Sequence, residues 1–444
     1  MSGRAEEVLQ GIVLRRVLAA LIEYRKYSRD QRACLCHYLL SEEEQASPLL
    51  LRHSQTLRGL ELRSPPPAVH LSHLTRLHLW GTVDPQLVAL HLSAGLWPSL
   101  RSLRLYGQIP LTPQLWDALP PSLTSIHDFV FSSPLGSLPK PSIRKAQFTR
   151  CADGLTALLP NLESLSIQYA SDTAWNSLAD LPRLRSIHYD LRWDPDWQRP
   201  FPALRRLISL KGIPSGQTYD FALLAPGLTH LFVRLFSSLL PWDCLPVSLE
   251  HLAVRFDYKS KSAAELCPDT SKRLPRLRHL QFLARAVNLP RLDQLAPALE
   301  TLQLHALAKL IPPASLQRLL IVSRGHEPTD PSLLTPVLAL AVNLRSLNLH
   351  DLAYQALEEL PWPPGLAQLT IRAPPAGAWA FLPRLLAAVR TRPLTLSYLR
   401  DTPPSTLDQL LGEAKHLAPR VHRFYILPMG RYGGECQDII YEDQ

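Results

Sequence analysis

The stretch Leu74-Thr-Arg-Leu77-His-Leu79 contains the pattern that decides the fold of this chain. It reads leucine, two residues, leucine, one residue, leucine, and other large apolar residues replace some of the leucines. The pattern returns in copies that begin at Leu100, Leu162, Leu228, Leu249, Leu277, Leu299, Leu344 and Leu366, and in weaker form at Leu57, Leu123, Ile143, Leu184, Leu204 and Leu316. A recurring unit of this kind indicates a solenoid, in which each repeat packs against its neighbours.

The spacing between copies predicts what each repeat contains. Successive starts lie between 17 residues apart, from Leu57 to Leu74, and 28 residues apart, from Leu249 to Leu277. Each copy predicts a short strand whose fourth and sixth residues point into the core, while the third, fifth and seventh point outward. We therefore predict an α/β solenoid shaped as a horseshoe. It has a parallel sheet on its concave side, helices and loops on its convex side, and a small helical cap at its N-terminal end.

Several local signals refine this prediction. A proline often stands two or three residues ahead of the first leucine, where it would end the crossing segment. Helix starts are expected at Thr112-Pro113 and at Ser171-Asp172, since each begins with a residue type that caps helices. The copy at Leu123 is weak because Asp128 stands where the third leucine belongs, and Ser209 does the same in the copy at Leu204.

The chain divides into four predicted parts. Residues 1–55 show helical spacing at Leu9, Val13, Val17 and Leu21 and form a helical cap or an F-box-like module. Residues 56–400 form the solenoid. Residues 401–429 form a helix and strand that cap its other end, and residues 430–444 form a flexible tail.

Composition limits the classes of function. The 444 residues carry a formal net charge of +9, which favours an acidic partner, and nucleic acid is not expected. The six cysteines follow no disulfide or zinc spacing, and no apolar run is long enough to cross a membrane. We therefore expect a cytoplasmic or nuclear protein that has no membrane contact.

Motifs for catalysis are absent from the sequence. It contains no Gly-x-Gly-x-x-Gly, no phosphate-binding loop, no His-Glu-x-x-His and no Gly-x-Ser-x-Gly. We predict that the protein is not an enzyme and has no catalytic residues, no metal site and no cofactor.

The repeats resemble those of leucine-rich repeat proteins over about seven tenths of the chain. The asparagine that commonly follows the third leucine is missing, as in Leu79-Trp-Gly-Thr82. The chain is therefore more similar to irregular F-box/leucine-rich-repeat proteins and to FNIP-type repeats, whose phrases resemble Leu119-Pro-Pro-Ser-Leu123. The first resemblance implies that residues 1–55 dock on a ubiquitin-ligase scaffold adaptor while the repeats hold a substrate. Leu14, Val17, Leu18 and Leu21 resemble the first F-box helix, although the opening Leu-Pro dipeptide is missing.

The outward positions of the strands predict the binding surface. In fifteen repeats these positions hold eight of the 16 histidines, together with many arginines and few acids. His230, His251 and His279 share the third position of successive copies and would form a column. Three interpretations of this column stay open: neutral polar side chains that cover an exposed sheet, a pH-sensitive contact with a partner, or a metal site. A basic, histidine-rich concave face favours an acidic protein partner, including a phosphorylated one. The predicted partner-binding residues are Arg76, His78, Trp80, Arg104, Tyr106, His127, Phe129, Lys145, His188, His230, Phe232, Arg234, His251, Arg255 and His279.

Overall fold

The computed structural model divides the chain into two compact units, residues 1–184 (unit 1) and 185–444 (unit 2). The structure describes residues 39–40, 58–62, 68–79, 83–131, 138–151, 153–189, 203–209, 225–235, 242–256, 273–283, 287–289, 291–304, 307–322, 331–350, 360–372 and 394–397.

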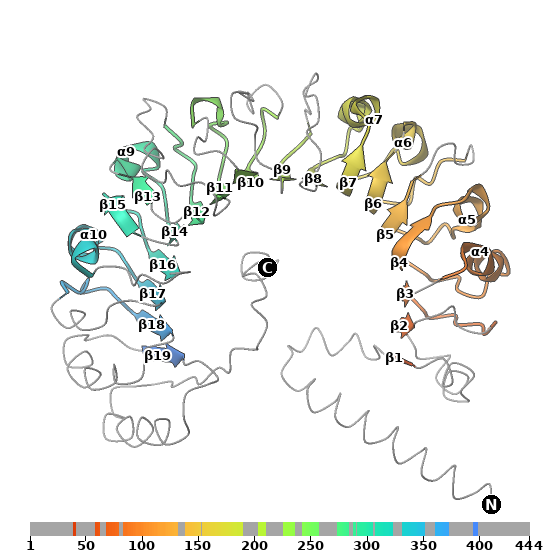
Figure 1. Cartoon of the computed structure of the whole chain (residues 1–444), viewed down its shortest axis with the longest axis horizontal. Helices are drawn as coiled ribbons and strands as arrows, with labels where there is room; N and C mark the ends of the chain where they lie inside the picture. Colours follow the sequence, from red (N-terminus) through yellow and green to blue (C-terminus); the bar gives the residue numbers. More distant parts are fainter. Residues whose placement is uncertain are drawn as a thin grey trace, which may run out of the picture. The chain divides into compact units, whose positions relative to one another are not determined.

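Unit 1 is a parallel sheet with helices on one face. Its strands are β1 (Leu39–Leu40), β2 (Gly59–Leu62), β3 (Arg76–Leu79), β4 (Ser102–Pro110), β5 (Ser125–Val130), β6 (Lys145–Cys151) and β7 (Ser164–Ala170). Each strand pairs in parallel with the next. The crossing segments contain α4 (Pro85–Ser93), α5 (Pro113–Ala118), α6 (Leu155–Leu158) and α7 (Asp172–Ser177), followed by the 3-10 turn η2 (Leu178–Asp180). These helices cover one face, and we call the other the open face (Figure 1).

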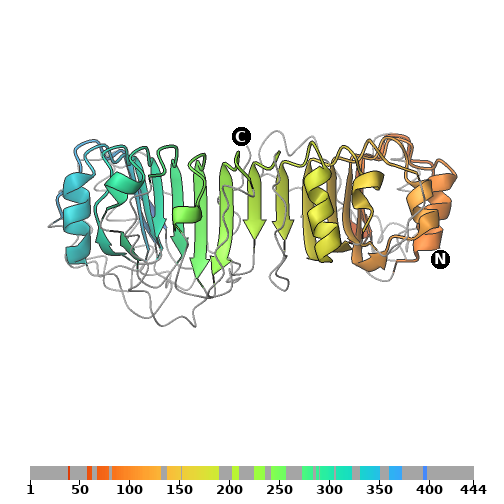
Figure 2. The ribbon, with the colours of Figure 1, turned by 90° about the horizontal axis from the view of Figure 1, so that it is seen from above.

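Unit 2 repeats this plan with fewer helices. Its main sheet contains β8 (Ser186–Tyr189), β9 (Arg206–Ser209), β10 (His230–Leu235), β11 (His251–Phe256), β12 (His279–Leu283), β14 (Thr301–Leu304), β16 (Arg318–Val322), β17 (Ser346–His350), β18 (Gln368–Arg372) and β19 (Leu394–Ser397). Neighbours in this order pair in parallel, and the strands run the same way (Figure 2). The crossing segments hold a second pair of strands, β13 (Val287–Leu289) and β15 (Leu307–Leu310), with α9 (Leu292–Leu295), α10 (Leu334–Leu340), η3 (Trp242–Cys244) and η5 (Pro331–Leu333).

The leucine pattern forms the core of each repeat. Leu74, Leu77 and Leu79 are completely buried, and the matching apolar residues whose burial the structure describes are buried in the same way. In α5 and α7, Trp116 and Trp175 are also completely buried and add to the core between helix and sheet. Burying a large apolar side chain stabilises the fold by about 1.5–3 kcal/mol.

The two predicted helix starts are confirmed. The Thr112 hydroxyl accepts a hydrogen bond from the backbone N–H of Leu115 at 3.2 Å, and Pro113 is the first helical residue of α5. The Ser171 hydroxyl accepts one from Ala174 at 3.1 Å at the start of α7. Each cap satisfies a backbone donor that the helix itself leaves without a partner.

A β-turn ends at the first leucine of most described repeats. The backbone N–H of Leu100 donates to the carbonyl of Trp97 at 3.2 Å, with Pro98 as the second residue of the turn. Proline suits this place because its fixed φ matches the second residue of a type I turn. The same turn, with the same proline, recurs ahead of the strands that begin near Leu184, Leu228, Leu277 and Leu299.

Serine hydroxyls replace the asparagine ladder that the sequence lacks. The Ser122 Oγ lies 2.9 Å from the carbonyl oxygen of Pro98 and 2.8 Å from that of Leu100, one repeat earlier. Ser248 and Ser315 make the same pair of contacts in unit 2. The polar ladder therefore lies at the turn ahead of the strand, where it joins consecutive repeats.

These features define the fold as a leucine-rich repeat solenoid. Of the predicted N-terminal module of residues 1–55, only β1 is described, and it is a strand of two residues within a segment expected to be helical. The predicted C-terminal cap at 401–429 and the tail at 430–444 lie outside the described residues. Within the described part of the chain, no helix combines the length and hydrophobicity needed to cross a bilayer.

Candidate functional site

The predicted surface residues fall into two groups, one on each unit. Unit 1 carries Arg76 and His78 on β3, Arg104 and Tyr106 on β4, His127 and Phe129 on β5, and Lys145 on β6. Unit 2 carries His188 on β8, His230, Phe232 and Arg234 on β10, His251 and Arg255 on β11, and His279 on β12. Trp80 and the side chain of Arg234 lie outside the described residues.

Cations dominate the open face of unit 1. Arg76 and Lys145 are exposed, and Arg104 and Tyr106 are half-buried between them. The strand register places Arg76, Ser102, Ser125 and Lys145 in one row across β3 to β6. Because neighbouring strands lie about 4.8 Å apart, the row spans about 14 Å.

Phe129 does not belong to this surface, so its place among the partner-binding residues was wrong. Its side chain is completely buried, and it is paired across the sheet with Phe148 of the core. The pairing of β5 with both neighbours is irregular between Ile126 and Phe129, where Asp128 is an extra residue with a φ of 67°. An inserted residue of this kind is a β-bulge, and it shifts the residues after it to the opposite face.

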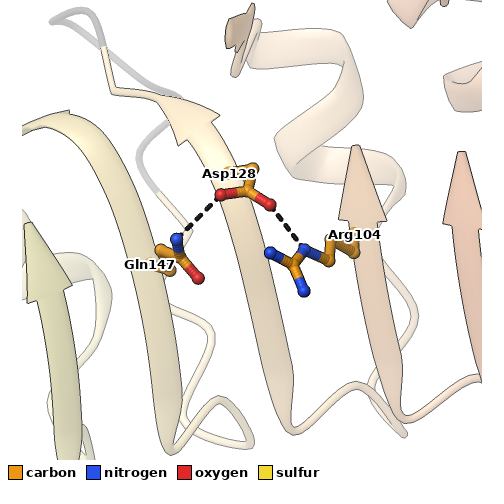
Figure 3. A network of polar contacts seen from close by, with 3 residues as sticks. All are labelled: Arg104, Asp128 and Gln147. Atoms are coloured by element: carbon orange, nitrogen blue, oxygen red, sulfur yellow. Dashed lines mark hydrogen bonds and ion pairs between the residues drawn. The ribbon is translucent and has the colours of Figure 1, made fainter. Parts of the chain in front are cut away.

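The bulge brings a carboxylate into the centre of the cationic surface. Asp128 Oδ2 accepts a hydrogen bond from Arg104 Nε at 2.5 Å, and Asp128 Oδ1 accepts one from Gln147 Nε2 at 2.8 Å (Figure 3). The guanidinium carbon of Arg104 lies 4.3 Å from the centre of the Tyr106 ring, within cation–π range. The sequence offers one signal for this network, which is the aspartate at a leucine position. By itself, that signal indicates only that the repeat at Leu123 departs from the pattern.

His127 lies beside this network. Burial lowers the pKa of His127 below its usual value, and its hydrogen bond with Gln147 opposes that shift. The charge of Arg104 also lowers the pKa, whereas that of Asp128 raises it. The imidazole is therefore neutral at neutral pH, and the positive charge of this surface comes from arginine and lysine.

The open face of unit 2 contains the histidine column. The Cα atoms of His230, His251 and His279 are aligned across β10, β11 and β12. The rings of the first two are 4.1 Å apart and 9° from parallel, and those of the last two are 4.1 Å apart and 10° from parallel. The Thr229 hydroxyl lies 2.9 Å from His230 Nδ1. The column is therefore a face-to-face stack with one ring on each strand.

Burial, helped by neighbouring positive charge, keeps the column uncharged. Burial, followed by the neighbouring rings of His230 and His279, lowers the pKa of His251 to about 3. Burial is also the main reason why the pKa values of the two outer histidines are lowered, and Arg206 adds to the effect on His230. At neutral pH the three histidines therefore present a neutral polar surface, which agrees with polar cover among the readings that the sequence left open.

The geometry of the column does not suit a metal ion. Each imidazole lone pair lies in the plane of its ring, so the lone pairs of parallel rings run side by side and do not converge on one point. The described residues contain no group of three or more histidines, cysteines, aspartates or glutamates that could hold a metal.

Arginines flank the column on the open face of unit 2. Arg206 and Arg318 occupy the row of the column on β9 and β16. The row beside the column holds half-buried Phe232 and Gln281, which is only 6% exposed, and half-buried Arg255 lies farther along β11. The centre of this face is therefore neutral, whereas the Arg104–Asp128 pair lies at the centre of the open face of unit 1.

Comparison with known proteins gives structural likenesses but no match by sequence. No protein-family model matches the chain, and no curated protein matches it by sequence. A solved structure of CroV588, described as a novel circular LRR protein, aligns with 77% of this chain at 16% sequence identity and a TM-score of 0.46. The alignment covers 50% of that protein, so this chain spans about half of its length.

Leucine-rich repeat folds generally serve as protein-binding scaffolds, because stacked strands present a long and rigid surface. They are typically non-catalytic. The two open faces differ in their chemistry, cationic in unit 1 and neutral at the centre of unit 2.

Proposed function

We propose that the protein is an interaction scaffold that binds an acidic segment of a protein partner on the open face of unit 1. The observation that carries this proposal is a set of three cations on the open face of unit 1. Exposed Arg76 and Lys145 stand at the two ends of one row, half-buried Arg104 lies between them in the next row, and Asp128 is the single described acid among them. Such a surface attracts an acidic partner and fixes how it docks.

Binding of a fluorescein-labelled hexaglutamate peptide to the full chain, followed by fluorescence anisotropy at low salt, tests this function. We expect the double variant Arg76→Glu/Lys145→Glu to bind about tenfold more weakly or worse. The control is Arg101→Glu/Arg183→Glu, which makes the same change in net charge at two exposed sites of unit 1 that precede the strands and lie outside the row of Arg76 and Lys145. An equal loss in both variants would show that only net charge matters, and the proposal would fail.

An F-box-type substrate receptor of a cullin-based ubiquitin ligase is the second candidate. It is favoured by the helical spacing of Leu14, Val17, Leu18 and Leu21 in residues 1–55. The test is co-precipitation of a purified cullin adaptor with the full chain and with the variant Leu14→Asp/Leu18→Asp. Adaptor capture that the variant loses supports this role, and no capture by the full chain excludes it.

A further inference from the structure

Arg104 differs from Arg76 and Lys145, the exposed cations of the open face, because its side chain is held in place. Its Nε donates to Asp128 at 2.5 Å, and the face of its guanidinium lies on the Tyr106 ring at 4.3 Å. Asp128 is held in turn by Gln147 from the next strand (Figure 3). An arginine that is already ordered loses little conformational entropy when a partner binds, so it is suited to be an anchor.

The backbone of β5 is distorted to make this arrangement. Asp128 adopts a φ of 67°, a left-handed conformation that is unfavourable for residues other than glycine, although aspartate tolerates it better than most. In a regular strand this position would point into the core, where the carboxylate could not stay charged without a partner. The bulge places Phe129 there instead and turns Asp128 toward Arg104.

One edge of the guanidinium remains available for a partner. Asp128 takes the Nε donor, and no hydrogen bond joins Nη1 or Nη2 to any residue that the structure describes. The Arg104 side chain is 32% exposed. Nη1 and Nη2 together offer two parallel N–H donors, the geometry that binds both oxygens of one carboxylate.

We propose that Arg104 is the anchor of the acidic partner, that it binds one carboxylate of a Glu or Asp side chain in bidentate fashion, and that Asp128 is the residue that positions it. This inference rests on the proposed function. Arg76 and Lys145 flank the anchor and provide single charges for further carboxylates along the same segment. A dianionic phosphate fits less well, because it would concentrate two negative charges close to Asp128.

The two possible roles of Asp128 predict opposite effects on peptide binding when its carboxylate is removed. In Asp128→Gly the backbone can keep its positive φ, and the net charge of the protein rises by one. If Asp128 only neutralises Arg104, this variant binds the hexaglutamate peptide more tightly. If Asp128 positions Arg104, the variant binds about fivefold to tenfold more weakly in spite of its added charge. Asp128→Asn keeps one oxygen that can accept from Arg104 Nε, its NH2 can donate to the Gln147 amide oxygen once that amide turns over, and it tolerates the left-handed backbone, so we expect it to stay within about twofold of the wild type.

Two further comparisons distinguish a failure of this inference from a failure of the proposed function. Arg104→Lys keeps the charge but loses the paired donors, and we expect about a tenfold loss with unchanged thermal unfolding. The matched Lys145→Arg variant should bind as the wild type does. Tighter binding by Asp128→Gly overturns this inference while leaving the proposed function intact, whereas a wild-type chain that does not bind the peptide overturns both. A phosphoserine peptide of equal total charge that binds more tightly than hexaglutamate overturns the assignment of a carboxylate.

Discussion

The outward strand positions are charged on the open face of unit 1 and neutral at the centre of the open face of unit 2. In unit 1, a bulge places Asp128 beside Arg104, and the guanidinium is fixed while Arg76 and Lys145 stay exposed. In unit 2, three histidines on unbulged strands stack on one another and become neutral. Neighbours on adjacent strands therefore decide whether an outward histidine is protonated and whether an outward arginine is free to move. The residue type alone does not decide either property.

The largest expected effect is on the free energy of unfolding, through Phe129, the residue that the bulge turns into the core. Because Phe129 fills the core of unit 1, Phe129→Ala should lower the free energy of unfolding by about 3–5 kcal/mol. Phe232→Ala removes the same side chain from a half-buried place on the open face of unit 2 and should cost clearly less. Urea denaturation of the two variants measures the difference. Equal losses would contradict the assignment of the two phenylalanines to opposite faces.

The second contrast is in the dependence of stability on pH. The pKa of His251 is about 3 in the folded state, below its ordinary value of 6.5, so the unfolded chain binds more protons between these values. Its contribution to stability is therefore fully present above pH 6.5 and is lost as the pH falls toward 3. His251→Asn should give a shallower fall of the melting temperature over this range.

The control for the pH experiment is His73→Asn, which replaces an exposed histidine of unit 1. It should leave the pH dependence of the melting temperature unchanged. An unaltered slope in His251→Asn would mean that the stack does not oppose protonation of its middle ring.

The smallest effect should be shared by both units. Ser122→Ala and Ser248→Ala each remove a hydroxyl that joins a turn to two carbonyls of the preceding repeat. Each should cost about 1 kcal/mol of unfolding free energy, the usual value of an intramolecular hydrogen bond. Calorimetry on both variants compares them, and a large difference would show that the turn ladder supports one unit more than the other.

Much of the architecture could be predicted from the sequence, because the leucines repeat at intervals that only one kind of packing satisfies. Leu74, Leu77 and Leu79 are buried as expected, and the alignment of His230, His251 and His279 followed from counting along the same pattern. The helix starts at Thr112 and Ser171 were also local signals, since a cap needs only residues three or four positions apart.

The candidate site was harder to predict, because its decisive contacts join residues of different strands. Arg104, Asp128 and Gln147 are separated by 19 to 24 residues along the chain. A count along the sequence also assumes regular alternation, and the bulge at Asp128 breaks it, which is why Phe129 was placed on the wrong face. The column of His230, His251 and His279 was predicted from the repeat pattern, but its lowered pKa values depend on burial and on the rings of adjacent strands.

The sequence by itself therefore determined the repeat, the parallel sheets and the side of the strand on which most residues lie, because hydrophobic burial follows a period of two along a strand. Only the tertiary structure decided which outward residues are charged, paired or held in place. Those properties depend on distances between strands of less than about 5 Å, at which a hydrogen bond or a stacked ring changes both the pKa and the freedom of a side chain.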